Sequence, residues 1–178
     1  MERDTQRKKL YTAERTAFGT VAAAKVRHET VADIERYVRH VCSLKRVRES
    51  WPKARLDTWP IEVRDGRGRG AARGNQWCIR MPKWSRSSWV ILHEMAHSIH
   101  LRTHRGVAYH GWQYAEIYLR LVLLALGREA HDALKAAFKA GRVRYSQPKT
   151  RAPLSPERKA QLVATLAAAR AARVNEKK

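Results

Sequence analysis

The pentapeptide His93-Glu94-Met95-Ala96-His97 places the strongest constraint on how this chain can fold. Two histidines four positions apart project from the same face of a helix, so both imidazoles can reach one tetrahedral Zn²⁺. Glu94 adjoins the first histidine, where its carboxylate can act as general base toward a zinc-activated water. Residues 85–102 are otherwise mostly apolar, which predicts a core helix whose polar groups need partners. The pattern predicts a zinc hydrolase, most often a peptidase.

A catalytic zinc usually takes a third ligand from the protein, and the sequence offers several candidates after the pentapeptide. His110 follows a loop and precedes Gly111, a residue type that lets the backbone approach a site closely. Glu116, on the next expected helix, is the second candidate. His100 and His104 fit positions behind the ligands or at the surface better than ligation. We favour His110 and keep Glu116 as the alternative.

The pentapeptide, a spacer of twelve residues and then His110-Gly111 resemble the SprT-like (Spartan-type) zinc metalloproteases. The closer likeness is to a poorly characterised group of metallohydrolases from actinobacteria and their phages. It extends to residues 11–15, 31–38, 79–82, 118–122 and 126–130. The resemblance implies a zincin-like fold with His93, His97 and His110 as zinc ligands and Glu94 as the base, acting on a protein or peptide substrate.

The expected chemistry is attack of the activated water on a peptide carbonyl, after which Glu94 passes the proton to the leaving amine. A tyrosine or histidine near the metal would stabilise the oxyanion, and Tyr109, Tyr114 and His104 are the candidates. Relatives often carry Pro-Glu after the His-Gly pair, where this chain has Trp112-Gln113. The wall on the substrate side is therefore expected to differ from theirs.

The patterns predict an α+β fold, mostly helical, with a small antiparallel β-hairpin or sheet before the pentapeptide helix. Residues 61–64 and 77–81 alternate as strands do. If the second lies at the sheet edge, it can bind an extended substrate by strand addition; an ordinary covered strand is the alternative. Helical periodicity covers 7–26, 30–44, 85–102, 112–126, 129–140 and 155–173. We expect a zincin-like domain over 1–144, followed by a basic linker and Ala-rich helix over 145–178.

The net charge of +21, from 37 Lys and Arg against 16 Asp and Glu, predicts contact with a polyanion such as nucleic acid. The Gly/Arg-rich loop 65–74 and the strand before it supply the candidate contacts, Arg64, Arg67, Arg69 and Arg73. A solvated basic loop is the alternative. Two rival functions follow: a basic nucleic-acid-binding module with a non-catalytic zinc site, and a toxin-like peptidase whose charge serves delivery.

Cys42 and Cys78 form neither a CxxC pair nor a disulfide framework. The N-terminal residues are charged, and no apolar signal segment follows them. The most apolar run, 119–126, is short and contains Arg120, so no membrane span is expected. These features predict a reducing, cytoplasmic location, and the sequence carries no signal for an oligomeric state.

Overall fold

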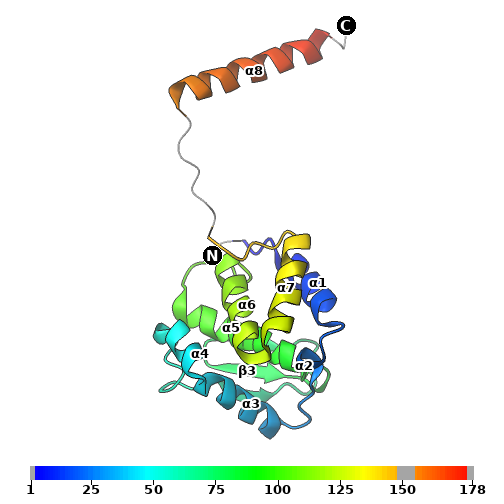
Figure 1. The fold of residues 1–178 in the computed structure, drawn as a ribbon, viewed down its shortest axis with the longest axis vertical. Helices are drawn as coiled ribbons and strands as arrows, with labels where there is room; N and C mark the ends of the chain where they lie inside the picture. The colour runs from blue at the N-terminus through cyan, green and yellow to red at the C-terminus, as the bar shows by residue number, and fades with distance from the viewer. Residues whose placement is uncertain (1–2, 148–154, 176–178) are drawn as a thin grey trace. The chain divides into compact units, whose positions relative to one another are not determined.

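The computed structural model describes residues 3–147 and 155–175, and it divides the chain into two compact units, Met1–Gln147 and Pro148–Lys178. The first unit is an α+β fold in which helices surround a small sheet (Figure 1). The second contains helix α8 (Pro156–Asn175), where the Arg158 amide donates to Ser155 Oγ at 3.3 Å. The helix predicted over 155–173 is confirmed, and it begins with Pro156 directly after Ser155, a pair typical of helix starts. Most of the expected linker, residues 148–154, lies outside the described part.

Seven α-helices and two 3₁₀ turns build the described part of the first unit. They are α1 (Arg7–Phe18), α2 (Ala22–Lys25), α3 (Val31–Ser43), α4 (Lys45–Ser50), η1 (Pro52–Ala54), η2 (Lys83–Ser85), α5 (Ser88–Thr103), α6 (Trp112–Leu126) and α7 (Arg128–Ala140). The single helix predicted over 7–26 is wrong. Its first part ends at Phe18, because Gly19, a poor helix former, follows. At the start of α3, Thr30 and Asp33 form a capping box. Gly127 joins α6 to α7 with φ of +87°, which favours glycine.

The sheet contains β1 (Glu62–Asp65), β2 (Arg73–Gly74) and β3 (Cys78–Met81) in the order β1-β3-β2. The predicted small sheet before α5 is confirmed, but its all-antiparallel arrangement is wrong, because β1 runs parallel to β3 and only β2 runs antiparallel to it. Residues 66–72 instead cross the end of β3 before the chain returns. The crossing is tight, because a Cβ on Gly66 would lie 2.6 Å from the Pro82 ring. Of the two alternatives for 77–81, the edge strand is wrong and the covered strand fits, because β3 is central.

Helix α5 lies at the centre of the core and fixes the position of the pentapeptide. Its buried side chains cover nearly every face, and it packs against α6, β2 and β3 (Figure 1). A helix that is apolar on all sides is held by packing in every direction. Helix α1 packs against α7 in the same unit. The two histidines of the pentapeptide are therefore presented by a rigid element.

Both cysteines are buried free thiols, and burial raises the pKa of Cys42 to about 11. Within residues 3–147 and 155–175, we find no helix with the length and apolar character that crossing a membrane requires.

Candidate metal centre

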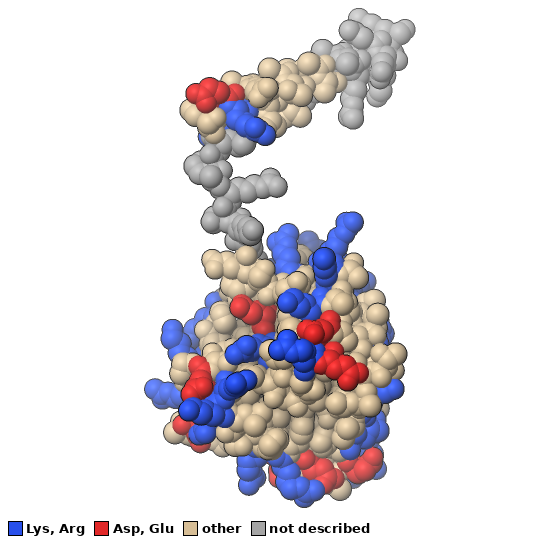
Figure 2. All heavy atoms as spheres, in the orientation of Figure 1, with Lys and Arg blue, Asp and Glu red and all other residues tan. Residues whose placement is uncertain are grey.

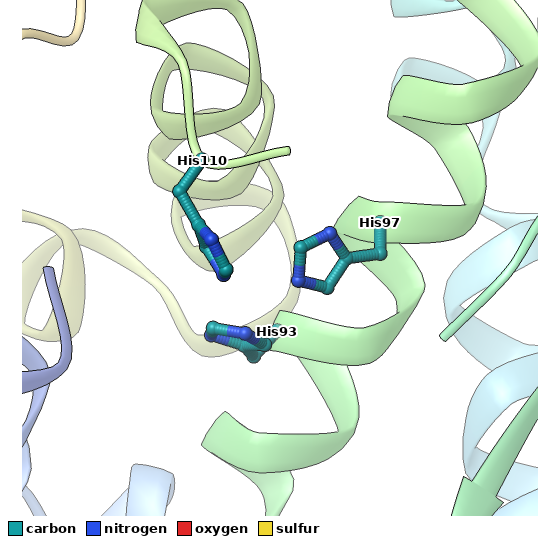
Figure 3. A group of neighbouring side chains, drawn as sticks. All are labelled: His93, His97 and His110. Carbon is teal, nitrogen blue, oxygen red and sulfur yellow. The ribbon is translucent and has the colours of Figure 1, made fainter. Parts of the chain in front are cut away.

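Three histidines from two neighbouring segments of the chain meet at one point of the first unit. His93 and His97 come from successive turns of α5, and His110 comes from the segment just before α6. One ring nitrogen of each lies within 4.8 Å of the others, and all three residues are buried. Figure 3 shows their rings turned toward one another. This group can hold one metal ion, so the expected meeting of His93, His97 and His110 is confirmed as geometry.

Two carboxylates stand behind this trio, and neither was predicted from the sequence. Glu14 Oε1 lies 2.5 Å from Nδ1 of His93, and Asp4 Oδ2 lies 2.6 Å from Nδ1 of His110. An Nδ1–H that donates to a carboxylate leaves Nε2 free as a metal ligand, an arrangement typical of metal-binding histidines. In agreement with this, Nε2 of His110 is buried and has no hydrogen-bond partner among the described residues. The buried polar atoms therefore fit a bound cation.

The electrostatics of the trio disfavour its full protonation. The pKa of His97 is lowered well below its usual value, first by burial and then by the neighbouring His93 and His110. Burial also lowers the pKa of His110, against the opposing effect of Asp4. Burial acts in the same direction on His93, but the charge and hydrogen bond of Glu14 outweigh it and raise the pKa of His93. Neutral imidazoles are the form that binds metal.

Glu94 is buried beside the trio. Its side chain and that of His93 line the same surface pocket. Burial raises the pKa of Glu94, while His93 and a hydrogen bond from the Gly74 backbone lower it. A Cβ on Gly74 would lie 2.3 Å from the backbone oxygen of Glu94. Strand β2 therefore packs directly on α5 at the residue expected to act as the base.

The tyrosines near the trio have different environments. Tyr114 is fully buried, and its hydroxyl donates to the backbone oxygen of His93 at 3.2 Å. It holds α5 in place and has no donor left for a substrate. Tyr11, which the sequence reasoning missed, is 40% exposed, and its ring centroid lies 5.5 Å from that of His93 and 5.4 Å from that of His110. Tyr109 is also partly exposed, with its ring 5.8 Å from that of His97.

The other expected polar residues lie elsewhere. His104 Nδ1 bonds to Thr103 Oγ1 at 2.9 Å, and His104 shares a separate hollow with Glu116. His100 is buried, with both ring nitrogens unpartnered among the described residues, and its ring stacks on that of His104. In the described part of the chain, no other three His, Cys, Asp or Glu side chains are close enough to share a metal ion.

The basic residues are spread over the surface, as the face drawn in Figure 2 illustrates. Of the four predicted nucleic-acid contacts, Arg64 pairs with Glu62 at 2.7 Å and Arg67 with Asp65 at 3.4 Å. Arg69 and Arg73 are exposed and make no ion pair with any described residue. A different hollow of about 330 Å³ is lined by cations from three helices and by leucines, without a carboxylate: Lys45, Arg46, Arg120 and Arg128. The four cations therefore form a basic groove.

The size of a surface hollow does not by itself identify the metal centre. A surface hollow of about 810 Å³ lies between α3 and β1 and shares no residue with the histidine trio. Comparison of the chain with models of protein families, with curated proteins and with solved structures gives no match.

Proposed function

We propose that this protein is a zinc-dependent hydrolase with a zincin-like fold that cleaves peptide bonds. The observation that carries the proposal is the buried trio of His93, His97 and His110, two of them backed by carboxylates, beside the buried Glu94. Three imidazoles leave one of four tetrahedral positions open, which is the donor set of catalytic rather than structural zinc sites. The resemblance of the pentapeptide and His110-Gly111 to SprT-like proteases supports the same choice.

The residues of the chain divide the chemistry among them. When bound, zinc supplies a Lewis acid that acidifies water and polarises a carbonyl group. Glu94 accepts the proton of the attacking water and returns it to the leaving amine. Tyr11, which is exposed and in ring contact with two of the histidines, is the hydroxyl that we assign to the developing oxyanion. Glu14 and Asp4 hold their histidines in the tautomer that ligation requires.

Zinc content and peptide cleavage, measured on the same preparations, test this proposal. We expect about one zinc per wild-type chain and a large loss in His110→Ala. Glu94→Gln should keep the metal and lose about 10²–10⁴-fold in turnover, the usual contribution of a general base. Absence of zinc after reconstitution, or undiminished cleavage by Glu94→Gln, would refute the mechanism.

We propose nucleic-acid binding as a second function of the same chain. The supporting observations are the net charge of +21 and the basic groove formed by Lys45, Arg46, Arg120 and Arg128. Two of the four arginines first expected to bind are paired with carboxylates, whereas of the four groove cations only Lys45 is paired with a described carboxylate, that of Glu49 at 3.8 Å. This difference favours the groove over the Gly/Arg-rich loop. A chain with both functions would act on proteins bound to the same polyanion.

Anisotropy titrations with a fluorescent DNA duplex at several salt concentrations test the second function. Each phosphate contact contributes about 0.9 to the slope of log K against log salt. Replacing Arg46 and Arg120 by alanine should therefore reduce the slope by about 2. The matched pair, Arg64→Ala with Arg67→Ala, should change it less, because both side chains are partly neutralised. No binding at low salt would refute nucleic-acid contact, and a larger effect of the loop pair would refute the groove.

A further inference from the structure

A small pocket adjoins the histidine trio on the side of Glu94. It has a volume of about 300 Å³ and is formed by α1, the crossing loop 66–72, η2 and α5. His93 and Glu94 form part of its wall. Ligand pockets for whole small molecules run from roughly 300 to 1,000 Å³. This pocket is therefore suited to a single side chain of a larger ligand.

The remaining walls of the pocket are mainly apolar. The crossing loop contributes Ala71 and Ala72, η2 contributes Trp84, and α5 contributes Trp89 and Val90. Trp84 is 59% exposed, although tryptophan is usually largely buried. Exposed apolar surface at the rim of a concave site commonly marks a binding surface. The pocket therefore offers aromatic and aliphatic contacts next to the group expected to activate water.

The charges around the pocket argue against a cationic occupant. Glu14 reaches it but is buried and hydrogen-bonded to His93. Arg15 is exposed at the rim, and no described carboxylate pairs with it. A lysine or arginine side chain would therefore meet a cation at the entrance and no free carboxylate except Glu94. An uncharged side chain meets no electrostatic repulsion from Arg15.

We propose that this pocket binds an aromatic or large aliphatic side chain of the peptide substrate, at a fixed position next to the scissile bond. The inference rests on the proposed peptidase function, because continuity with His93 and Glu94 is what orients the bound peptide. Trp84 would provide an aromatic wall for the side chain, and the small side chains of Ala71 and Ala72 leave room for it. The pocket thus selects the substrate, and the metal centre cleaves it.

Cleavage of a mixed peptide library by the zinc-loaded protein, read by mass spectrometry, tests the specificity. We expect Phe, Tyr, Trp, Leu or Met to be enriched at one position beside the cleaved bond. Trp84→Ala should lower kcat/KM for Phe peptides about tenfold, the scale on which an apolar pocket discriminates. Ala71→Leu, at an exposed wall position, should shift the preference toward smaller side chains. Trp77→Ala is the matched control, because Trp77 is 51% exposed but lies outside the pocket.

A binding measurement separates failure of the pocket from failure of the peptidase function. N-acetyl-phenylalaninamide should shift the indole N–H resonances of Trp84 and Trp89 in the zinc-loaded protein, whereas N-acetyl-alaninamide should not. If the aromatic amide binds but no peptide is cleaved, the pocket stands and the peptidase function falls. If peptides are cleaved with a preference that Trp84→Ala and Ala71→Leu leave unchanged, the pocket proposal is overturned and the peptidase function stands. Absence of both binding and cleavage overturns both.

Discussion

The buried carboxylate of Glu14 provides the sharpest test of how the metal centre is held. It lies 2.5 Å from His93 Nδ1 and is 1% exposed, so water cannot replace it. Glu14→Gln keeps the size of the side chain and a hydrogen-bond acceptor but removes the negative charge. A hydrogen bond to a charged group is roughly twice as strong as a neutral one. The substitution should therefore weaken zinc binding without removing a wall of the core.

The expected size of the effect follows from the burial of each carboxylate. Loss of a partner behind a metal-ligating histidine costs about 10–100-fold in metal affinity, which corresponds to ~1.4–2.8 kcal/mol. Glu14, fully buried, should lie near the upper end of this range. Asp4 holds His110 in the same way, but its side chain is 26% exposed. Asp4→Asn should therefore lie near the lower end.

Competition with a chromophoric chelator of known zinc affinity, at fixed pH and salt, gives the dissociation constants. Asp132→Asn is the matched control, because Asp132 makes the same contact with His131 Nδ1 at 2.7 Å, away from the trio. The zinc affinity of the Asp132→Asn variant should equal that of the wild type. Unchanged affinity in Glu14→Gln would refute the reasoning, as would a larger loss in Asp4→Asn than in Glu14→Gln.

Three further substitutions test separate parts of the site. Tyr11→Phe should lower kcat about 10²–10³-fold with zinc retained, if its hydroxyl stabilises the oxyanion; unchanged turnover removes that role. Burial lowers the pKa of His100 to about 4, so the unfolded chain binds the proton first and stability falls as the pH drops from 6.5 toward 4. Over that pH window, the free energy of unfolding of His100→Leu should therefore fall by ~3 kcal/mol less than that of the wild type. Denaturant unfolding in EDTA measures the difference. Gly74→Ala should destabilise by about 1–3 kcal/mol, because its Cβ meets the Glu94 backbone; Gly70→Ala, with open space around it, should not.

The residues of the trio could be predicted because their signal is local. The spacing of His93 and His97 is itself a helical property, and His110-Gly111 follows soon after. The supporting carboxylates could not be found in this way, because Asp4 and Glu14 reach the site from another helix and the segment before it. One signal was present: Glu14 is the lone acid on the apolar face of α1, between buried positions such as Ala13 and Ala17. Its neighbours on the same helical face, at positions 10, 11, 17 and 18, carry no cation. A buried carboxylate without a cation on its own face indicates a distant partner.

The distinction between signals within one segment and contacts between distant segments also holds for the fold. Helices α3 and α6 match the predicted ranges because caps and periodicity are encoded within each segment. The sheet was predicted wrongly because strand direction depends on where the connection crosses. Residues 61–64 and 77–81 read as a hairpin pair, yet Gly66 allows the loop to pass Pro82, so that β2 rather than β1 runs antiparallel to β3. Nothing in the alternation of a strand records the direction of its neighbour.

The metal centre also ties the start of the chain to its core, which leads to a last prediction. The segment before α1 is held on one side by Gln6, which exchanges two hydrogen bonds of 3.0 Å with the Arg144 backbone. On the other side, Asp4 is held by its hydrogen bond with His110 Nδ1. With zinc bound, His110 is fixed as an Nδ1–H donor. Burial lowers the pKa of His110 and favours the neutral ring, so without zinc only the hydrogen bond to Asp4 holds the Nδ1–H tautomer.

Removal of zinc should therefore increase amide exchange most in residues 3–10, with little change in α3, whose capping box lies away from the trio. Glu14 should protect the later part of α1, because its hydrogen bond to His93 Nδ1 is buried, and its charge raises the pKa of His93 and so strengthens the pair without the metal. Hydrogen exchange with mass spectrometry on zinc-loaded and EDTA-treated protein gives the comparison. A uniform rise across the first unit would mean that the metal stabilises the whole core. A rise confined to the N-terminal segment would mean that the metal stabilises this segment locally, and that the contact of Asp4 with His110 weakens first when the metal is removed.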